Sequence, residues 1–403
     1  MEKVLNDYMA HPQRHASAVG FSLIRAEDDP QFIQSFKGSL GFGRTEQFRD
    51  DSFIWLASAT KLVTTTAVLI ASQMGLLSLQ DTADTYLPEL AEMEILIGFE
   101  ACLTGGSIPI TKRAKNPITI HQLLTHTSGL AYLFLTKDLK KWATYNNRRS
   151  DELSSSLEDC HHPLLFEPGQ GWAYGPGFDW AGRIIEVVSQ CSFEEFCKRY
   201  IWDQIGAHDC TFRPKSRPDL LARRLEITRP TRNNGVSMNL NPYPLEPSHD
   251  LGGIGLWTTP RDFNLFLWHL FIKPNGLVTP ENLNRILEPQ VSDTKLVTES
   301  MHGSNGGILT STFPEHFPLD FGLGACITTR DLPGRRPKGS VSWLGYPNEY
   351  WWFDPKNKIC GVLYMQMIPA GLNEAANLLV GVEEAVYKDM RGRGIPEVQM
   401  QRL

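Results

Sequence analysis

The chain has 403 residues, of which 41% are hydrophobic and 21% charged, and its formal net charge is −6. This length exceeds one compact core, so we expect two lobes of an ordinary globular protein. A weak negative charge spread along the chain gives no basic surface for nucleic acid or an anionic membrane, and no apolar run is long enough to span a bilayer.

The predicted elements fall into three parts of the chain. Strand-like runs rich in β-branched and aromatic residues lie near both ends, whereas the middle has helical spacing between long loops rich in proline and glycine. In chain order we predict a helix over residues 1–13, strands over 18–25 and 32–36, a long apolar helix from Ser58 to near Gly75, a loop over 81–90, helices over 120–124, 179–189, 193–200 and 261–271, strands over 321–329, 339–344, 350–354 and 359–367, and a helix over 373–390.

Strands at both ends of the chain and helices in the middle predict an α+β fold. One central antiparallel sheet would be built from the two termini and flanked by helices. We place this α/β domain at residues 1–80 and 316–403, and an inserted, mainly helical lobe with substrate-facing loops at residues 81–315.

A serine begins the long apolar helix, and a lysine follows three residues later. Positions i and i+3 share a helix face, so the Ser58 hydroxyl and the Lys61 amine should point into the same space. Free N–H groups at the helix N-terminus suit a developing oxyanion, and an adjacent amine can take or relay a proton. A second Ser-x-x-Lys copy at 292–295 lies in a polar stretch that we interpret as exposed surface. A lysine in apolar company is costly without a partner or a function, which favours a nucleophile at Ser58.

Two later stretches offer partners for this serine. Tyr174 lies in a glycine-rich loop just before a helix, where its phenol can project into a cleft; the alternative is a buried ring that caps the helical lobe. The strand over 339–344 runs into Trp343-Leu344-Gly345, and such a strand edge can offer a backbone N–H to an oxyanion. The alternative there is an ordinary buried tryptophan followed by a turn.

A histidine is the third candidate. His126 can be read as the general base of a triad, but we interpret it as structural, with ring nitrogens that tie down the turn before Gly129. Asp179 and Asp250 could orient such a base, although their spacing favours neither.

Taken together, these segments resemble the serine β-lactamase superfamily. The similarity rests on Ser58-Ala59-Thr60-Lys61, the run 123–130, Tyr174 in its glycine loop and Trp343-Leu344-Gly345, which stand in the order typical of that superfamily. It extends from about residue 18 to 390 and is greatest to the class C-like esterases and transesterases, including fungal acyltransferases of the lovastatin type. The resemblance implies the β-lactamase/transpeptidase-like fold, an α/β sandwich with a helical lobe.

The resemblance also implies residue roles. Ser58 would be the acylated nucleophile, and Lys61 and Tyr174 would share the general-acid and general-base work. The backbone N–H groups of Ser58 and Tyr346 would form the oxyanion hole. No cofactor and no metal are implied. We further expect four residues to contact the substrate: Trp343, Gly345, Tyr132 and Trp257.

Two departures from the family pattern argue against β-lactam hydrolysis. Class C β-lactamases place an asparagine two residues after the tyrosine and begin their third motif with a lysine, whereas this chain has Pro176 and Trp343 at those positions. The aromatic residues near Trp343 suit an apolar acyl chain or a fused-ring scaffold better: Tyr346, Tyr350, Trp351 and Trp352.

We therefore predict an acyltransferase of natural-product biosynthesis. It would move an acyl group from a thioester through Ser58 to a hydroxyl of a small polyketide-like acceptor, and an acyl carrier protein domain of a polyketide synthase is the candidate that would carry the thioester. The alternative is an esterase or thioesterase that passes the same acyl group to water. A non-catalytic binding protein on this scaffold is disfavoured because Ser58, Lys61 and Tyr174 are all present.

The cysteines bear on location. Seven cysteines at scattered spacings, without a Cys-x-x-Cys pair or a zinc-type grouping, favour free thiols in a reducing compartment. We expect a cytoplasmic protein that has neither nucleic acid nor membrane as a partner.

Overall fold

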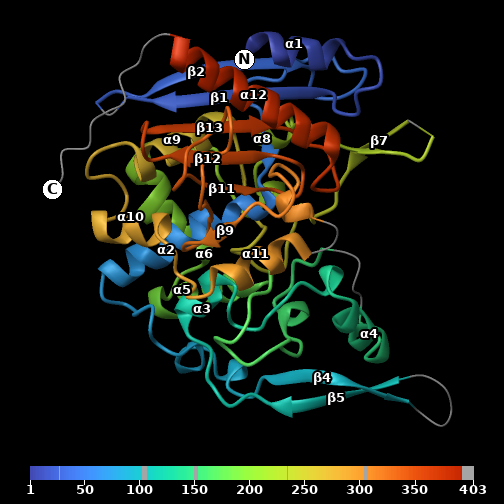
Figure 1. Cartoon of the computed structure of the whole chain (residues 1–403), viewed down its shortest axis with the longest axis vertical. Coiled ribbons are helices and arrows are strands. Elements are labelled where there is room, and N and C mark those ends of the chain that lie inside the picture. Colours follow the sequence, from blue (N-terminus) through green and yellow to red (C-terminus); the bar gives the residue numbers. More distant parts are fainter. Residues whose placement is uncertain (27, 102–106, 149–152, 234, 304–306, 393–403) are drawn as a thin grey trace.

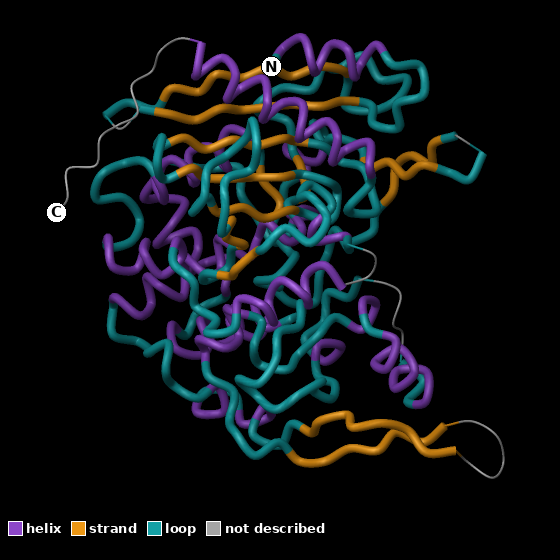
Figure 2. Tube along the Cα trace, in the orientation of Figure 1, coloured by secondary structure: helices purple, strands orange, loops and turns teal. Residues whose placement is uncertain are grey.

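The computed structural model describes residues 1–26, 28–101, 107–148, 153–233, 235–303 and 307–392 (Figures 1 and 2). Its α-helices are α1 (Glu2–Ala10), α2 (Thr60–Gln73), α3 (Ile120–Thr125), α4 (Lys137–Tyr145), α5 (Gly177–Ser189), α6 (Phe193–Cys197), α7 (Asp203–Ile205), α8 (Pro218–Leu221), α9 (Pro260–Phe271), α10 (Pro280–Leu287), α11 (Thr294–Gly303) and α12 (Asn373–Gly392). The strands are β1 (Ala18–Arg25), β2 (Gln31–Gly38), β3 (Ile54–Trp55), β4 (Glu94–Ala101), β5 (Ser107–Arg113), β6 (Ile227–Pro230), β7 (Val236–Leu240), β8 (Trp257–Thr258), β9 (Leu319–Phe321), β10 (Cys326–Thr328), β11 (Val341–Leu344), β12 (Tyr350–Asp354) and β13 (Ile359–Tyr364). Within the described part of the chain, every helix is too short or too polar to cross a membrane.

A seven-stranded antiparallel sheet forms the centre of the fold. Its strand order is β2-β1-β13-β12-β11-β10-β9, so β1 from the N-terminal part pairs directly with β13 from the C-terminal part. The inner strands β12 and β13 are buried along their whole length, which explains why they read as continuous apolar runs rather than alternating ones. The predicted α+β fold with a central antiparallel sheet is confirmed.

Helices cover both faces of this sheet. α1 and α12 run side by side along one face (Figure 1), where the Tyr387 hydroxyl of α12 donates to the Asp354 carboxylate of β12 at 2.9 Å. α9 packs on the opposite face, where the ring of Phe271 stacks on Phe353 with 4.6 Å between centroids. The sheet therefore has no solvated face in its centre.

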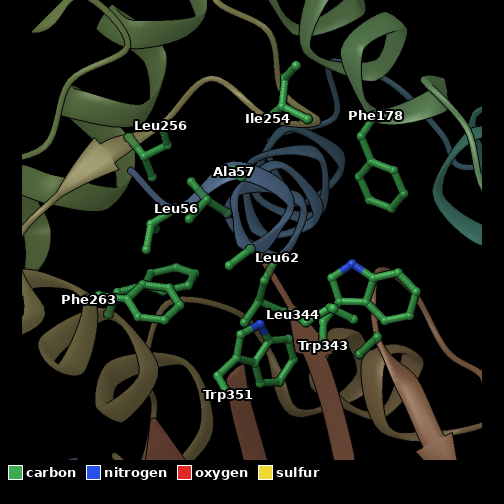
Figure 3. Packing of buried hydrophobic residues seen from close by; sticks show 14 of the residues in the cluster. Leu56, Ala57, Leu62, Phe178, Ile254, Leu256, Phe263, Trp343, Leu344 and Trp351 are labelled. Atoms are coloured by element: carbon green, nitrogen blue, oxygen red, sulfur yellow. The ribbon is translucent and has the colours of Figure 1, made fainter. Parts of the chain in front are cut away.

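The helix that follows Ser58 lies in the core. In α2, the twelve residues from Thr60 to Ala71 are all buried. Leu62 projects toward Leu344 and Trp351 of the sheet, while Phe178 of α5 flanks the helix on another side (Figure 3). The buried threonines of this helix, Thr64, Thr65 and Thr66, donate their hydroxyls to backbone carbonyls, which allows these polar side chains to lie in the core.

Some elements differ from the prediction. The run 321–329 is not one strand: β9 and β10 pair with each other across a turn in which Gly324 has φ of +75°. The middle of the chain also contains the hairpins β4–β5 and β6–β7, which the helical reading missed; β4–β5 projects at the end of the molecule far from the sheet (Figure 2). A register shift beside Gly98 interrupts the alternation in β4 that would have revealed it.

Two smaller expectations concern the chain outside the sheet. Lys295, in the second Ser-x-x-Lys copy, has a side chain 82% exposed, so that stretch is surface as predicted. The division into residues 1–80 with 316–403 and residues 81–315 stays a prediction, because one continuous hydrophobic core includes residues from both parts.

Candidate active site

Ser58 lies in a short 3₁₀ helix, Ala57–Ala59, between strand β3 and helix α2. The residue before it, Ala57, has φ of +45°, a left-handed conformation that costs a residue with a side chain about 1 kcal/mol. This strained turn is closed by a hydrogen bond from the Ala59 N–H to the Leu56 carbonyl at 3.1 Å. It places the serine at the N-terminal end of the buried helix.

The side chains of Ser58, Lys61 and Tyr174 lie together. The Tyr174 hydroxyl donates to Ser58 Oγ at 2.6 Å, and Lys61 Nζ donates to the same oxygen at 3.4 Å. Lys61 Nζ also donates to the Tyr132 hydroxyl at 3.0 Å and to the Gly253 carbonyl at 2.8 Å. The three N–H bonds of the ammonium therefore each have an acceptor, which allows a lysine only 1% exposed to remain in the core.

The loop that carries Tyr174 is fixed against a neighbouring segment. The Tyr132 N–H donates to the Tyr174 carbonyl at 3.0 Å, and the two rings meet edge to face with 5.1 Å between centroids. Gly175 approaches this segment so closely that a Cβ would lie 2.2 Å from the Leu130 carbonyl oxygen. Only glycine permits this contact, so the glycine-rich loop sets the position of the phenol.

His126 packs behind Tyr174 and has no contact with Ser58. Its carbonyl accepts a hydrogen bond from the Ala173 N–H at 2.9 Å and its Nδ1 accepts one from the Gly175 N–H at 3.4 Å. Burial, together with the charge of Lys61, holds the pKa of this histidine well below its usual range. His126 is structural, as predicted, but its ring nitrogen holds the Tyr174 loop and not the turn before Gly129.

Ser58 opens into an apolar cavity of about 140 Å³, which we call the Ser58 cavity. Tyr132, Gly345 and Tyr346, three of the residues expected near the substrate or the oxyanion, line it. None of its described lining residues is charged. The full set is Ala57, Ser58, Tyr132, Phe134, Leu135, Leu153, Tyr174, Ile254, Ile308, Leu309, Leu344, Gly345, Tyr346, Pro369 and Ala370.

Two of the residues expected to contact the substrate, Trp343 and Trp257, lie outside the Ser58 cavity. Trp343 is 3% exposed and packs edge-on against the ring of Tyr174, with 5.3 Å between centroids, so it supports the phenol from behind. Trp257 is 1% exposed and stacks on Phe53 and Trp55 in the core. Neither lines the Ser58 cavity. Three more aromatic residues that were expected to suit an apolar substrate are buried in strand β12 and do not line the cavity: Tyr350, Trp351 and Trp352.

A second cavity of about 280 Å³ adjoins the first, and we call it the neighbouring cavity. The two cavities share the side chains of Tyr132, Phe134, Leu153 and Ile254 as a common wall. The further lining of the neighbouring cavity mixes polar and apolar residues: Leu133, Ser154, Ser155, Asp159, Cys160, His162, Pro176, Asp179, Pro244 and Leu251.

Sequence reasoning missed the segment that completes the lysine site. Gly253 accepts from Lys61, and Ile254 beside it lines both cavities. The available signal was the glycine-rich run Gly252-Gly253-Ile254-Gly255, which indicates a close backbone approach. No cluster of three or more metal-ligating side chains occurs among the residues that the structure describes.

This fold, with a serine and a lysine one helical turn apart and a tyrosine on the serine oxygen, defines the serine β-lactamase class of enzymes. The sequence profile described as Beta-lactamase matches residues 5–378, and the chain belongs to this family.

Two relatives indicate its branch of the family. A lovastatin esterase of Penicillium rubens is 32% identical, covering 84% of this chain and 86% of the relative. A monacolin J acid methylbutanoyltransferase of Aspergillus terreus is also 32% identical, covering 82% of this chain and 81% of the relative. The solved simvastatin synthase (LovD) of Aspergillus terreus, in its LovD6 mutant, has a TM-score of 0.88 at 27% identity and covers 97% of this chain and 94% of its own.

Proposed function

We propose that this enzyme is a serine acyltransferase that uses Ser58 as its nucleophile and Lys61 and Tyr174 as its proton carriers. The observation that carries the proposal is the meeting of both groups on one oxygen: Tyr174 Oη lies 2.6 Å and Lys61 Nζ 3.4 Å from Ser58 Oγ, at the edge of an apolar cavity. A serine needs this arrangement to lose its proton as it attacks a carbonyl.

The chemistry follows from these contacts. The attack requires the pair of Tyr174 and Lys61 to hold one proton fewer, as a phenolate beside the ammonium or as a phenol beside a neutral amine. Ser58 Oγ then attacks the thioester carbonyl, its proton passes to the vacant base of the pair, and the pair gives that proton to the departing thiolate. The acceptor hydroxyl then attacks the acyl-serine carbonyl, and its proton moves to the same pair. The bond between the acyl carbon and Ser58 Oγ breaks, and the pair returns the proton to Ser58 Oγ. The backbone N–H groups of Ser58 and Tyr346, two residues on the cavity wall, would hold the oxyanion in both steps.

The relatives suggest the substrates. The name of the Aspergillus terreus relative specifies a methylbutanoyl group and monacolin J acid, and we propose a polyketide-like alcohol as the acceptor here. An uncharged cavity suits a short branched acyl chain of this kind, and a thioester on an acyl carrier protein is the donor we propose. The six described cysteines are free thiols, in keeping with the cytoplasmic location that we propose.

β-Lactam hydrolysis fits this site poorly. Pro176, at the position of the amide-binding asparagine, has no side-chain donor, and Trp343, at the position of the lysine, is a buried ring behind Tyr174. The Ser58 cavity therefore has no described charged group to answer the carboxylate of a β-lactam.

An esterase is the second candidate, because a lovastatin esterase is as similar in sequence as the methylbutanoyltransferases are. The two activities share the acyl-enzyme and differ in what attacks it. Acyl transfer to the alcohol is faster than hydrolysis only where the site holds the acceptor in place, since effective molarities of held reactants reach roughly 10⁵ M.

One partition experiment tests the proposal. The protein is incubated with the methylbutanoyl thioester of N-acetylcysteamine, with and without monacolin J acid, and ester and free acid are quantified by mass spectrometry. We expect a mass increase on Ser58, and ester as the main product when the alcohol is present. Ser58→Ala is the control and should form neither product. Equal acid formation with and without alcohol would establish the esterase instead.

A further inference from the structure

Asp179 is a buried acid that the proposed reaction does not use. It lies in the first turn of α5, five residues after Tyr174, and is 2% exposed. Its Oδ1 accepts a hydrogen bond from the Gly253 N–H at 2.7 Å, while its Oδ2 has no hydrogen-bond partner among the described residues. A buried carboxylate with an unpartnered oxygen is costly to the fold, which calls for a functional reason.

Gly253 connects this carboxylate to the active site. Its N–H is held by Asp179, and its carbonyl accepts from Lys61 Nζ at 2.8 Å. A Cβ at position 253 would lie 2.6 Å from Asp179 Oδ2, so the carboxylate packs closely against the backbone of Gly253. The backbone of Gly253 thus contacts the Asp179 carboxylate through its N–H and the Lys61 ammonium through its carbonyl.

The charges around Asp179 are few. Lys61 on α2 is the positive group that acts on Asp179. Three neutral groups also respond to the Asp179 charge: Tyr132, Cys160 and Tyr243. Burial raises their pKa values well above the ordinary range, and the negative charge of Asp179 raises them further. Burial raises the pKa of the Asp179 carboxyl to about 6, although the Lys61 ammonium lowers it. Above that pH the carboxylate is the negative charge that balances the buried ammonium.

We propose that Asp179 is a positioning residue for Lys61 and acts through Gly253. By holding the Gly253 N–H, it fixes the carbonyl that aims the amine at Ser58 Oγ. This inference rests on the proposed function, in which Lys61 carries the proton of Ser58.

Substitutions at position 179 separate positioning from mere packing. Asp179→Ala removes the acceptor for Gly253, and we expect the rate of Ser58 acylation at saturating thioester to fall 10- to 100-fold, with the half-saturating concentration changed less than two-fold. Asp179→Asn keeps a carbonyl acceptor of the same shape, so the rate at pH 8 should return to within about five-fold of the wild type. Asp262→Ala is the matched control, since Asp262 is a buried acid that accepts backbone N–H bonds from His208 and Asp209. It should lower the melting temperature and leave the acylation rate within two-fold.

The pH dependence of melting gives a second readout. The folded-state pKa of about 6 lies above the unfolded value of 3.8, so the folded state binds the proton more tightly and the contribution of Asp179 to stability falls as pH rises from 4 to 6. Asp179→Asn lacks this titration, so its melting temperature should rise relative to the wild type across that window.

Two kinetic results would overturn the proposal: acylation by the alanine variant at the wild-type rate, or equal losses in the alanine and asparagine variants. A crystal structure of Asp179→Ala in which Lys61 Nζ stays at 2.8 Å from the Gly253 carbonyl would also overturn it. That measurement needs no turnover, so a wild-type protein that forms no acyl-enzyme would count against the proposed function and not against this placement.

Discussion

Tyr174 contributes two separable features to the site. Its hydroxyl lies 2.6 Å from Ser58 Oγ, and its ring packs against His126 and Trp343. Tyr174→Phe keeps the ring and removes only the hydroxyl. We expect acylation of Ser58, followed by intact mass, to slow by about 10²- to 10⁴-fold, the usual loss for a general acid or base, with the free energy of unfolding changed by about 1 kcal/mol at most.

A second tyrosine serves as the matched variant. The Tyr132 hydroxyl accepts a hydrogen bond from Lys61, and it stays neutral because burial raises its pKa well above the ordinary value. Tyr132→Phe should therefore cost about ten-fold in acylation, the equivalent of one lost hydrogen bond to a charged group. If Tyr132→Phe is the more damaging change, the assignment of the proton carriers is wrong.

The spacing of Ser58 and Lys61 identified the core of the site because an i, i+3 pair has one possible arrangement on a helix. The substrate contacts were harder to predict, since the sequence around a tryptophan does not distinguish a residue that lines a cavity from one that fills the core. Trp257 does the latter, whereas Ile254, which no motif marks, lines both cavities. The sequence spacing gave no reason to assign Asp179 a role, because Asp179 is connected to Lys61 through Gly253, which is distant from both in the sequence.

At the scale of elements, the turn between β11 and β12 supports the proposed oxyanion hole. Asn348 in this turn has φ of +59°, and its Nδ2 donates to the carbonyls of Met367 and Pro369, each at 2.6 Å. Its Oδ1 accepts from the Tyr350 hydroxyl at 3.0 Å and from the Gly371 N–H at 2.9 Å. One side chain thereby fixes the segment that follows Gly345.

This network predicts different costs for two substitutions. Asn348→Gly keeps the left-handed backbone and loses the hydrogen bonds, and we expect about 2–3 kcal/mol lower stability in urea unfolding. Asn348→Ala adds backbone strain, so it should cost about 1 kcal/mol more. Equal stability of the two variants would show that the backbone conformation contributes nothing.

Elements near the two ends were predictable because β-branched and aromatic runs have few alternatives in a buried sheet. The hairpin β4–β5 was not, since the register shift beside Gly98 hides its period and half of its residues face solvent. The run 321–329 was read as one strand because its apolar character continues through the turn at Gly324.

For the whole molecule, a buried charge cluster ties the C-terminal helix α12 to the loop between β10 and β11. Glu383 lies between Arg335, whose Nε donates to Oε2 at 2.7 Å, and Arg336, whose Nη1 donates to Oε1 at 2.6 Å. Glu383→Ala would leave two buried guanidiniums unpaired. We expect it to lower the free energy of unfolding by about 3–5 kcal/mol, measured by urea denaturation.

The neighbouring exposed Glu384 provides the control. Glu384→Ala should change stability by less than about 0.5 kcal/mol. A small effect of Glu383→Ala would mean that α12 is held by its apolar face alone, without help from the charges.

If the acyl chain lies in the Ser58 cavity, as we propose, the residues shared by the two cavities limit its length. Ile254 is one of these shared residues, and its carbonyl is anchored separately by the Trp55 indole N–H at 2.7 Å. Ile254→Ala should therefore keep the backbone in place while merging about 140 Å³ with about 280 Å³. In a competition between methylbutanoyl and decanoyl thioesters, we expect the variant to use more of the longer acyl chain than the wild type does. This one side chain would then determine which acyl-chain length the enzyme prefers.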